Sequence, residues 1–455
     1  MTIPPAATGG PGALIARVRG VLRGDDMEGT LARGALWAFG INVAGTIAAF
    51  GVQLVLARSL GEAHYGIYIY TLGWLNVVLL VAKLDWDHVS LRYLSAYSAL
   101  HDWSLLRGFL RRSDVIVGAT AGGAALLAAA AVWLFRSRLP PSLVAAYWAS
   151  CALLPVTAFL QVKSTSLQGL RRVVASQAPQ GVLRPVLFAL GLVVLAFGIG
   201  TQLTAALAIV INLAATAVVL VVAGWLLHRA VPAPARHAPP AYATREWLGV
   251  SGGMLAISAA QLVLSQNFDI VVVGSLLGTT QAGYYGAATQ LAMLCHFGVN
   301  AILFMTTPLI SELFAAGDRG ALQRLITFTS RLNVAVSLPV ALALLLGGRL
   351  VLRWYGPSFV AGYPVLVVLL GSQLAGTALG SLAGFLMSMT GHQNRAAVII
   401  GLSAVLYLAL TFVFTLAFGA VGTAFATLIA LLTRGIVLDR DIRKRLGIEV
   451  LPITL

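Results

Sequence analysis

A single carboxylate lies deep inside an apolar stretch of this chain. Asp269 opens the segment DIVVVGSLLGTTQAGYY, about nine residues, or roughly 13 Å of helix, before the turn that ends the apolar run. If the run crosses a bilayer, a charge at this depth costs on the order of 3 kcal/mol, so Asp269 should face the protein interior and have a partner or water. Two interpretations stay open: a coupling or gating carboxylate that binds an ion or a proton, and a buried polar tie between helices.

A second set of charges lies at the expected inner end of another apolar run. Lys83, Asp85, Asp87, His88 and Arg92 crowd together there, and Lys83 and Asp87 have the four-residue spacing that places side chains one helical turn apart. Such charges could form a coupling or gating device on the cytosolic side. The favoured interpretation is an exposed salt-bridge cluster, which contributes little to stability.

Four isolated cations lie at, or just inside, the inner ends of expected spans: Arg33, Lys163, Arg184 and Arg331. Guanidinium and ammonium groups form charge-assisted hydrogen bonds with phosphate oxygens, so several of them around one cleft would form a cationic vestibule for a phosphate-bearing substrate. Each one alone is equally well explained as a side chain that reaches to lipid headgroups. Their number favours the vestibule, and hence a substrate-binding role.

The composition indicates the environment of these residues. Of the 455 residues, 59% are hydrophobic and 10% are charged. Because about a quarter of the residues in a soluble domain are charged, this chain must place most of its apolar surface in lipid. Both cysteines, Cys151 and Cys295, lie in apolar runs, so no disulfide framework or metal cluster is expected. We expect a polytopic membrane protein without a cofactor.

Twelve apolar runs approach the length of about 20 residues that crosses a bilayer. Six precede a polar, proline-bearing linker and six follow it, so both halves enter the membrane in the same direction. They should be related by an axis along the membrane normal, with the substrate path between them. The expected spans cover about 35–57, 66–84, 114–135, 143–163, 178–199, 204–227, 248–277, 282–308, 328–348, 363–388, 397–417 and 420–437.

The charge distribution places both termini in the cytosol. All but five of the 30 Lys and Arg residues then lie on cytosolic loops and flanks, as the positive-inside rule requires. The net charge of +15 is therefore mostly a signal of topology, and no nucleic-acid partner is inferred from it. The expected domains are a cytosolic tail (1–30), an N-lobe (31–230), a cytosolic linker (231–246), a C-lobe (247–438) and a cytosolic tail (439–455).

The cytosolic segment 85–112 has apolar residues at three- and four-residue intervals with charges between them. This pattern predicts a helix that extends the second span and lies near the headgroups. The alternative is a solvated hairpin that packs on other cytosolic loops.

A short motif occurs once in each half. Leu60, Gly61, Gly66 and Tyr68 spell L-G-x4-G-x-Y, and Leu277, Gly278, Gly283 and Tyr285 repeat it in the same order between two long apolar runs. A weaker echo follows in each half, where Gly169 precedes Arg171 and Arg172, and Gly391 precedes Arg395. Two matches in the same order predict that the chain contains two copies of one structural unit.

Four segments together resemble a known family. They are LARSLGEAHYGIY after the first span, FDIVVVGSLLGTTQAGYYGAA at the seventh, PLISELFAAGD after the eighth, and VLRWYGPSFVAGYPVLVVLLGSQ entering the tenth. The chain resembles the polysaccharide transporter, or oligosaccharide flippase, family (Wzx-like). This family is part of the superfamily that also contains multidrug and toxin extruders. The resemblance covers about 31–438 and rests on diffuse motifs.

The resemblance implies an all-α fold of two six-helix lobes, like that of the multidrug and toxin extruders, around a cavity with alternating access. The implied cargo is a polyprenyl-pyrophosphate-linked oligosaccharide, carried from the cytosolic to the periplasmic face of a bacterial inner membrane for polysaccharide synthesis. The acidic position of the family's seventh span falls on Asp269. The implied partners are membrane lipids, H⁺ or Na⁺ as a coupling ion, and a polysaccharide polymerase or glycosyltransferase.

Two other classes of function are weighed against this one. A multidrug or cation antiporter would have the same fold, but cationic cargo calls for carboxylates in the cavity, and only Asp269 lies deep in an expected span. A membrane enzyme would place acidic residues or histidines in sizeable outer loops. The expected outer loops are short and contain one acidic residue, Glu62, so an enzyme is not expected.

Overall fold

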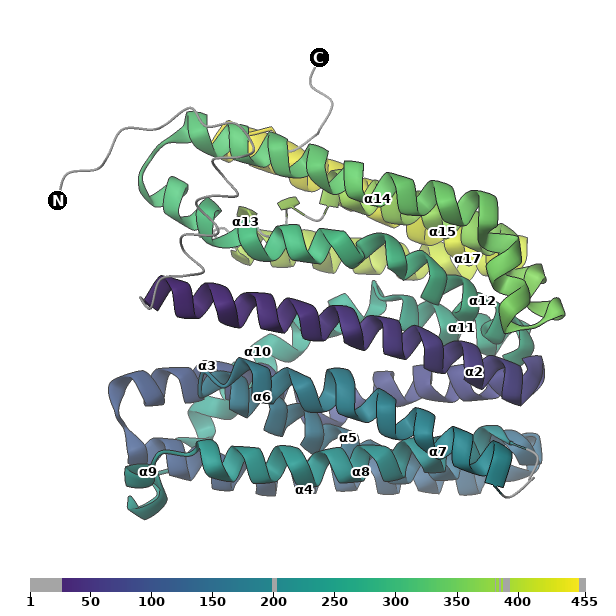
Figure 1. Cartoon of the computed structure of the whole chain (residues 1–455), viewed down its shortest axis with the longest axis horizontal. Helices are drawn as coiled ribbons and strands as arrows, with labels where there is room; N and C mark the ends of the chain where they lie inside the picture. Colours follow the sequence, from purple (N-terminus) through teal and green to yellow (C-terminus); the bar gives the residue numbers. More distant parts are fainter. Residues whose placement is uncertain (1–26, 199–202, 381, 384–385, 388–392, 450–455) are drawn as a thin grey trace.

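The computed structural model describes residues 27–198, 203–380, 382–383, 386–387 and 393–449 (Figure 1). In these ranges the chain is almost entirely helical and forms no strand. Helices satisfy their own backbone hydrogen bonds, which is what a bilayer demands of a spanning segment. Eight of the described helices are long and apolar enough to span a membrane, or nine if the bent pair Thr244–Val263 and Gln266–Leu277 counts as one span. The all-α polytopic fold is confirmed, and the count of twelve stays a prediction.

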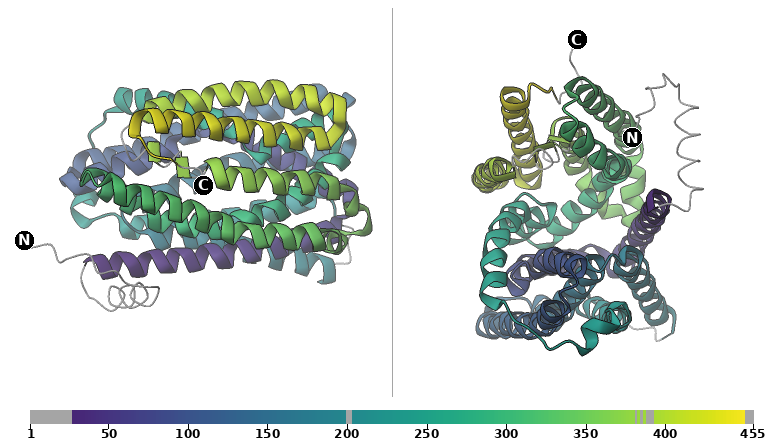
Figure 2. Two further views of the ribbon diagram at one scale, coloured as in Figure 1. Left: turned by 90° about the horizontal axis from the view of Figure 1, so that it is seen from above. Right: turned by 90° about the vertical axis from the view of Figure 1, so that its left-hand side faces the viewer.

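Two groups of helices make up the molecule, coloured purple to teal and green to yellow in Figure 2. We refer to the helices α2 to α8 as the N-lobe and to α10 to α17 as the C-lobe. The N-lobe consists of α2 (Met27–Lys83), α3 (Trp86–Leu100), α4 (Trp103–Phe135), the 3₁₀ turn η1 (Arg136–Arg138), α5 (Pro141–Gly169), α6 (Val173–Ala178), the π turn η2 (Pro179–Leu183), α7 (Arg184–Gly198) and α8 (Ala205–Ala230).

The linker contains α9 (Ala233–His237), and the C-lobe follows it. The linker is fastened to the N-lobe, because Arg107 on α4 donates to the carbonyl oxygen of Ala238 at 2.7 Å. The C-lobe consists of α10 (Thr244–Val263), α11 (Gln266–Leu277), α12 (Thr279–Ala292), η3 (Met293–His296), α13 (Phe297–Ala315), α14 (Arg319–Tyr355), η4 (Pro357–Gly362), α15 (Tyr363–Ala375), the π turn η5 (Gly376–Gly380) and α17 (Gln393–Leu446).

Glycines with positive φ end or break three of the helices at one end of the molecule. Gly61 (φ 68°) breaks α2, and Gly419 (φ 63°) breaks α17. The bond of 2.7 Å between Thr415 and Thr423 shows that α17 folds back on itself, because eight residues of straight helix would separate them by about 12 Å. Gly278 (φ 94°), the counterpart of Gly61 in the repeated motif, separates α11 from α12. We call this end the outer end, and the end that contains α3 and the linker the inner end.

The two lobes meet backbone to backbone near the outer end. Gly66 of α2 lies against α12 so closely that a β-carbon there would overlap the carbonyl oxygen of Thr279. A β-carbon on Gly283 would lie 2.9 Å from the α-carbon of Gly66. Gly66 and Gly283 are the equivalent glycines of the repeated motif, so each half supplies the same residue to the contact. Close by, the Tyr284 hydroxyl donates to Glu62 at 2.5 Å and thereby also joins the lobes.

At the inner end, α10 packs on α3 of the N-lobe. The indole of Trp247 is fully buried there, with its ring 5.0 Å from that of Phe109. Three hydrogen bonds fasten α10 to the N-lobe: Trp247 Nε1 to the Tyr97 hydroxyl (2.9 Å), Tyr93 hydroxyl to Glu246 (2.7 Å), and Ser251 hydroxyl to the Leu84 carbonyl oxygen (2.5 Å).

One expectation about this region is wrong, and another acquires a break. Segment 85–112 is not one helix continuing the second span, because Leu84, Asp85 and His101 adopt left-handed conformations that end α2 and separate α3 from α4. Its apolar stripe, including Trp86 and Val89, is buried against other helices of the protein. The expected span 248–277 is divided at Leu264–Ser265 into α10 and α11, with a bend of 60° between them.

The contact between the glycines predicts a specific sensitivity. Gly66→Ala should destabilise the folded protein by about 1–3 kcal/mol, the usual cost of overpacking, because neither backbone can move aside without separating α2 from α12. Gly51→Ala is the matched control, since it lies on the same helix and its β-carbon would meet no atom within 4 Å. Thermal unfolding of the purified protein in detergent measures both variants. Equal melting temperatures would contradict the contact.

Candidate functional site

Asp269 lies in the first turn of α11, directly after the bend that separates α10 from α11. Its side chain is completely buried. The Tyr285 hydroxyl donates to Oδ2 at 2.7 Å, and the Thr427 hydroxyl donates to the same oxygen at 3.1 Å. The bend gives α11 an amino terminus of its own beside Asp269, and the helix dipole favours a negative charge at such a terminus. The carboxylate thus joins α11, α12 and α17 inside the C-lobe.

Threonines extend this polar centre along the α17 hairpin. Thr411, Thr415 and Thr423 are fully buried, and the hydroxyls of Thr415 and Thr423 bond to each other at 2.7 Å. The single proton of the Thr427 hydroxyl is shared between Asp269 and the carbonyl oxygen of Thr423, each 3.1 Å away. The second oxygen of Asp269, Oδ1, has no hydrogen-bond partner among the described residues. A carboxylate with a free oxygen beside neutral hydroxyls has the ligand chemistry for a proton or a small hard cation.

A second polar centre lies inside the N-lobe and contains a cation. Arg184 begins α7 directly after the π turn, and its Nε and Nη2 donate to Oδ1 of Asn212 at 3.3 and 3.1 Å. Asn212 in turn donates from Nδ2 to the Tyr68 hydroxyl at 3.4 Å. No ion pair to Arg184 occurs within the described part of the chain. Its charge is therefore balanced only by dipoles, which leaves it able to attract an anion.

The two centres correspond to each other through the repeated motif. Tyr68 and Tyr285 are the equivalent tyrosines, and each bonds to a buried polar residue of its own lobe. The N-lobe centre contains a cation, Arg184, and the C-lobe centre contains a carboxylate, Asp269. Each tyrosine lies two residues beyond a glycine of the interlobe contact. Both polar centres are thus tied to the helices that join the lobes.

A pocket of about 300 Å³ lies between the lobes, a size at the low end of ligand sites. It is lined from three directions: α2 (Gly45, Ala49, Phe50), the π turn and α7 (Gln180, Gly181, Pro185), and α12 with η3 (Gln290, Met293, Leu294). Gly45 contacts Gly181 across this site. Pro185, the residue that follows Arg184 in the chain, lines the pocket, whereas the Arg184 side chain is directed to Asn212 of α8 and is not part of the lining.

The structure distributes the four predicted vestibule cations differently. Lys163 on α5 forms an ion pair with Asp114 of α4 at 2.5 Å, so its charge is already balanced. Arg331 is an exposed residue of α14 in the C-lobe. The side chain of Arg33 lies outside the described residues. Arg184 is the only one of the three described cations with a sequence neighbour that lines the interlobe pocket.

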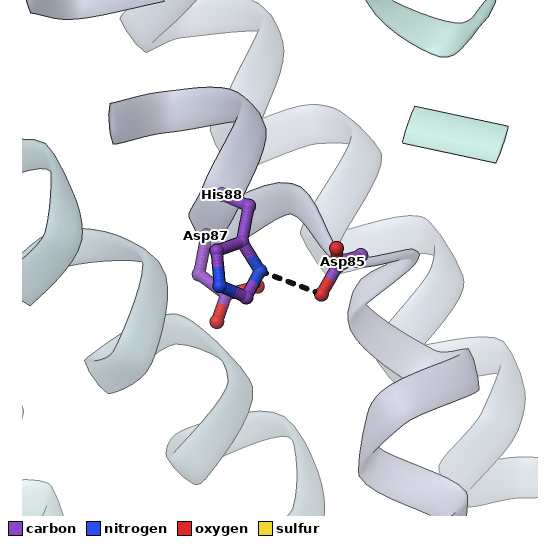
Figure 3. A group of neighbouring side chains, drawn as sticks. All are labelled: Asp85, Asp87 and His88. Atoms are coloured by element: carbon purple, nitrogen blue, oxygen red, sulfur yellow. Dashed lines mark hydrogen bonds and ion pairs between the residues drawn. The ribbon is translucent and has the colours of Figure 1, made fainter. Parts of the chain in front are cut away.

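Three residues of the charged cluster at the end of α2 are buried, not exposed as we had favoured, whereas His88 and Arg92 are exposed. Asp85 is 1% exposed, and Lys83 and Asp87 are each 9% exposed. Lys83 pairs with Asp87 at 2.6 Å. Figure 3 shows the half-exposed ring of His88, which bonds to Asp85 at 2.9 Å. The neighbouring carbonyl of Leu84 accepts from Ser251 of α10. The cluster therefore lies at the inner contact between the lobes, where a gating residue would have to be.

The bond between His88 and Asp85 shifts both of their pKa values. The Asp85 hydrogen bond raises the pKa of His88 above its ordinary value, against the opposing effect of burial. Burial opposes the charge of Asp85, but the bond and charge of His88 outweigh it and lower the pKa of Asp85.

Several of these residues were not recognised in the sequence as parts of a site. Asn212 and Thr427 are polar side chains within otherwise apolar runs, a signal that could have found them. Tyr68 and Tyr285 belong to the repeated motif, but a repeat does not reveal the partner of each tyrosine. The pairing of Arg184 with Asn212 joins two different helices and had no local signal.

The fold and the pocket between two lobes define a fold class, that of all-helical membrane proteins with two lobes. Solved structures of this class are similar to the chain. An inward-facing multidrug resistance MATE family transporter of the MOP superfamily is 15% identical, with a TM-score of 0.70 over 91% of this chain and 98% of that one. A MOP superfamily transporter from Pyrococcus furiosus, whose title reports a binding pocket of reversed polarity, is 15% identical, with a TM-score of 0.61 over 94% and 98%.

The family model described as polysaccharide biosynthesis protein matches residues 31–314, more than half of the chain. The chain belongs to this family, as its resemblance indicated. It is also 25% identical over 128 residues to the uncharacterized membrane protein EpsK of Bacillus subtilis. That match covers 28% of this chain and a quarter of the EpsK sequence.

The raised pKa of His88 predicts a pH-dependent stability. Folding raises the pKa of His88, so the bond to Asp85 stabilises the folded protein fully at a pH below the pKa of an unfolded histidine, about 6.5. This stabilisation disappears as the pH rises through the pKa of His88 in the folded protein. The lowered pKa of Asp85 acts in the other direction, and its contribution disappears only in acid. The melting temperature of the wild type should therefore exceed that of His88→Gln near pH 6, and the difference should shrink by pH 9.

His237→Gln is the matched control for this experiment. His237 is exposed on α9 and its Nδ1 bonds to a backbone carbonyl, not to a carboxylate. A His88→Gln difference that is the same at pH 6 and pH 9 would contradict the ion pair.

Proposed function

We propose that the protein is a flippase that moves a polyprenyl-pyrophosphate-linked oligosaccharide from the cytosolic to the periplasmic face of a bacterial inner membrane. The cargo would serve the synthesis of an exopolysaccharide, a capsule or an O-antigen. The family supports the cargo class, and one structural observation supports the route: Arg184, a cation without a carboxylate partner in the described chain, directly precedes Pro185, which lines the pocket between the lobes.

A cation one residue from the pocket lining would address the main energetic obstacle of this transport. The head of the cargo has a doubly phosphorylated linkage and many hydroxyls, and it must cross about 30 Å of hydrocarbon. Arg184 would replace part of the water and counterions that the diphosphate leaves behind, while the prenyl chain stays in the bilayer. Arg33, Lys163 and Arg331 are proposed as further substrate-binding cations. The pocket volume fits a diphosphate and not a whole oligosaccharide, so transport requires the lobes to separate further.

The closest rival is an antiporter of drugs or other cations. The MATE neighbours have the fold that such a transporter would need, and they fit either function. The described residues that line the interlobe pocket include two glutamines and no carboxylate. A cationic cargo would find no counter-charge on that lining, and Arg184 nearby would repel it. The polarity of the site therefore favours an anionic cargo.

Asp269 is proposed as the coupling or gating residue of the C-lobe, with H⁺ or Na⁺ as the ion. Its bonds to α12 and α17 mean that a change of its charge would alter the packing of the helices that meet the N-lobe. Lys83, Asp85 and Asp87 are proposed as the inner gate, because α10 leaves the N-lobe only if the contact at Leu84 opens. Both termini would be cytosolic, where a polysaccharide polymerase or glycosyltransferase is a further proposed partner.

Reconstituted transport tests the cargo. Vesicles that contain the protein should translocate a polyprenyl-pyrophosphate oligosaccharide and should not exchange a cationic dye. Arg184→Gln should weaken glycan binding about tenfold or more, because a charge-assisted hydrogen bond contributes about 1.5–3 kcal/mol. Arg349→Gln is the control. Arg349 belongs to α14, its guanidinium lies over the ring of Tyr363 on α15, and it does not line the pocket. Dye efflux without glycan transport would refute the flippase.

Asp269→Asn separates coupling from a structural tie. Asparagine keeps an oxygen that can accept from Tyr285 and Thr427, so the variant should fold and melt like the wild type. Its transport should fall about tenfold, because coupling between sites is typically about 1–3 kcal/mol and requires the charge. Asp269→Ala removes the acceptor as well and should also lower the melting temperature. If Asp269→Asn transports at the wild-type rate, the residue is only a tie.

A further inference from the structure

A second, larger pocket lies within the N-lobe and shares no lining residue with the one between the lobes. It has a volume of about 800 Å³ and is formed by α6, the π turn and α7 on one side and by α8 on the other. In Figure 1, α6 and α7 run alongside α8. No residue of the C-lobe contributes to its lining, so the groove does not depend on how the lobes are arranged.

The body of this groove is apolar. Val174, Ala178, Val182 and Val186 recur every fourth residue along α6 to α7, and Val222 and Leu226 face them from α8. Val174 and Val186 are 44% and 42% exposed. Both walls belong to helices that are apolar enough to span a membrane, so the groove opens onto hydrocarbon. Such an apolar groove fits the acyl chain of a lipid.

Two arginines close the inner end of the groove. Arg171 and Arg172 line it, both are exposed, and neither guanidinium forms an ion pair or hydrogen bond with another residue in the described ranges. The turn that holds them packs closely on α3, because a β-carbon on Gly169 would lie 3.0 Å from the β-carbon of Leu94. Arg171 adopts a left-handed backbone (φ 62°), which is unfavourable for a residue with a β-carbon. Two unpaired cations are thus held at the mouth of an apolar groove.

We infer that this groove is a binding site for an anionic phospholipid of the cytosolic leaflet. One acyl chain would lie between Val182 and Leu226, and the phosphate would bond to Arg171 and Arg172. Basic residues above a groove between spanning helices, on the side with the greater positive charge, match the chemistry of anionic headgroups. The cargo of the proposed function is not the occupant, because the groove is separate from the interlobe pocket. The bound lipid would brace α7, whose first residue is Arg184, against α8.

Lipid binding by the purified full-length protein tests this inference. Native mass spectrometry in detergent should detect phosphatidylglycerol bound more tightly than phosphatidylcholine, which has a neutral head. The double variant R171Q/R172Q should lose about tenfold or more of the affinity for phosphatidylglycerol and should leave that for phosphatidylcholine unchanged. R171K/R172K keeps the charge and should retain most of the binding.

Two further variants locate the site. R111Q/R112Q removes another adjacent pair of exposed arginines near the inner end of α4 and should bind like the wild type. Val174→Trp adds bulk at an exposed position of the groove and should weaken lipid binding while both arginines remain. The inference is overturned if R171Q/R172Q binds phosphatidylglycerol normally, if the two arginine pairs have equal effects, or if undecaprenyl phosphate displaces phosphatidylglycerol at lower concentration. Failure of glycan transport would not affect any of these results.

Discussion

The close approach of Gly66 and Gly283 is the constraint on which the arrangement of the two lobes depends. Two helix backbones can come this near only where neither residue has a β-carbon. The contact lies just beyond Gly61 and Gly278, whose positive φ angles end the preceding helices and set the direction of α2 and α12. Tyr284 and Glu62 add a hydrogen bond at the same level. The lobes are therefore joined at the outer end by small residues that tolerate little change in spacing.

Both polar centres lie close to this joint along the chain. Tyr68 and Tyr285 each follow a glycine of the contact by two residues, and they bond to Asn212 and Asp269. A change of charge at Asp269, or an anion near Arg184, would alter the position of these tyrosines and hence of the helices that touch. In the proposed function, this connection would be the route by which a bound ion or cargo separates the lobes. At the inner end, the bonds of α10 to α3 oppose that movement until they break.

The sequence predicted those features that depend on local pattern. The repeated motif indicated two equivalent turns, and both Gly61 and Gly278 have the left-handed backbone that such turns require. The depth of Asp269 in an apolar run indicated a buried carboxylate with a partner, and Tyr285 and Thr427 are its partners. Features that depend on contacts between distant helices were not predictable in this way. The partner of Arg184 is on α8, the stripe of α3 is covered by Trp247 of α10, and the balancing charge of Lys163 is on α4.

The central claim is that transport requires the lobes to move apart at the outer end, and cross-linking tests it most directly. Cysteines at Glu62 and Tyr284, in a protein whose Cys151 and Cys295 are replaced by serine, lie on opposite lobes and can be joined by a short, reducible thiol cross-linker. The account predicts that the cross-linked protein does not translocate a polyprenyl-pyrophosphate oligosaccharide and that reduction restores transport. The same linker between cysteines at Gln53 and Tyr65, both in the N-lobe, should have no effect. Full transport by the protein linked between Glu62 and Tyr284 would contradict the account.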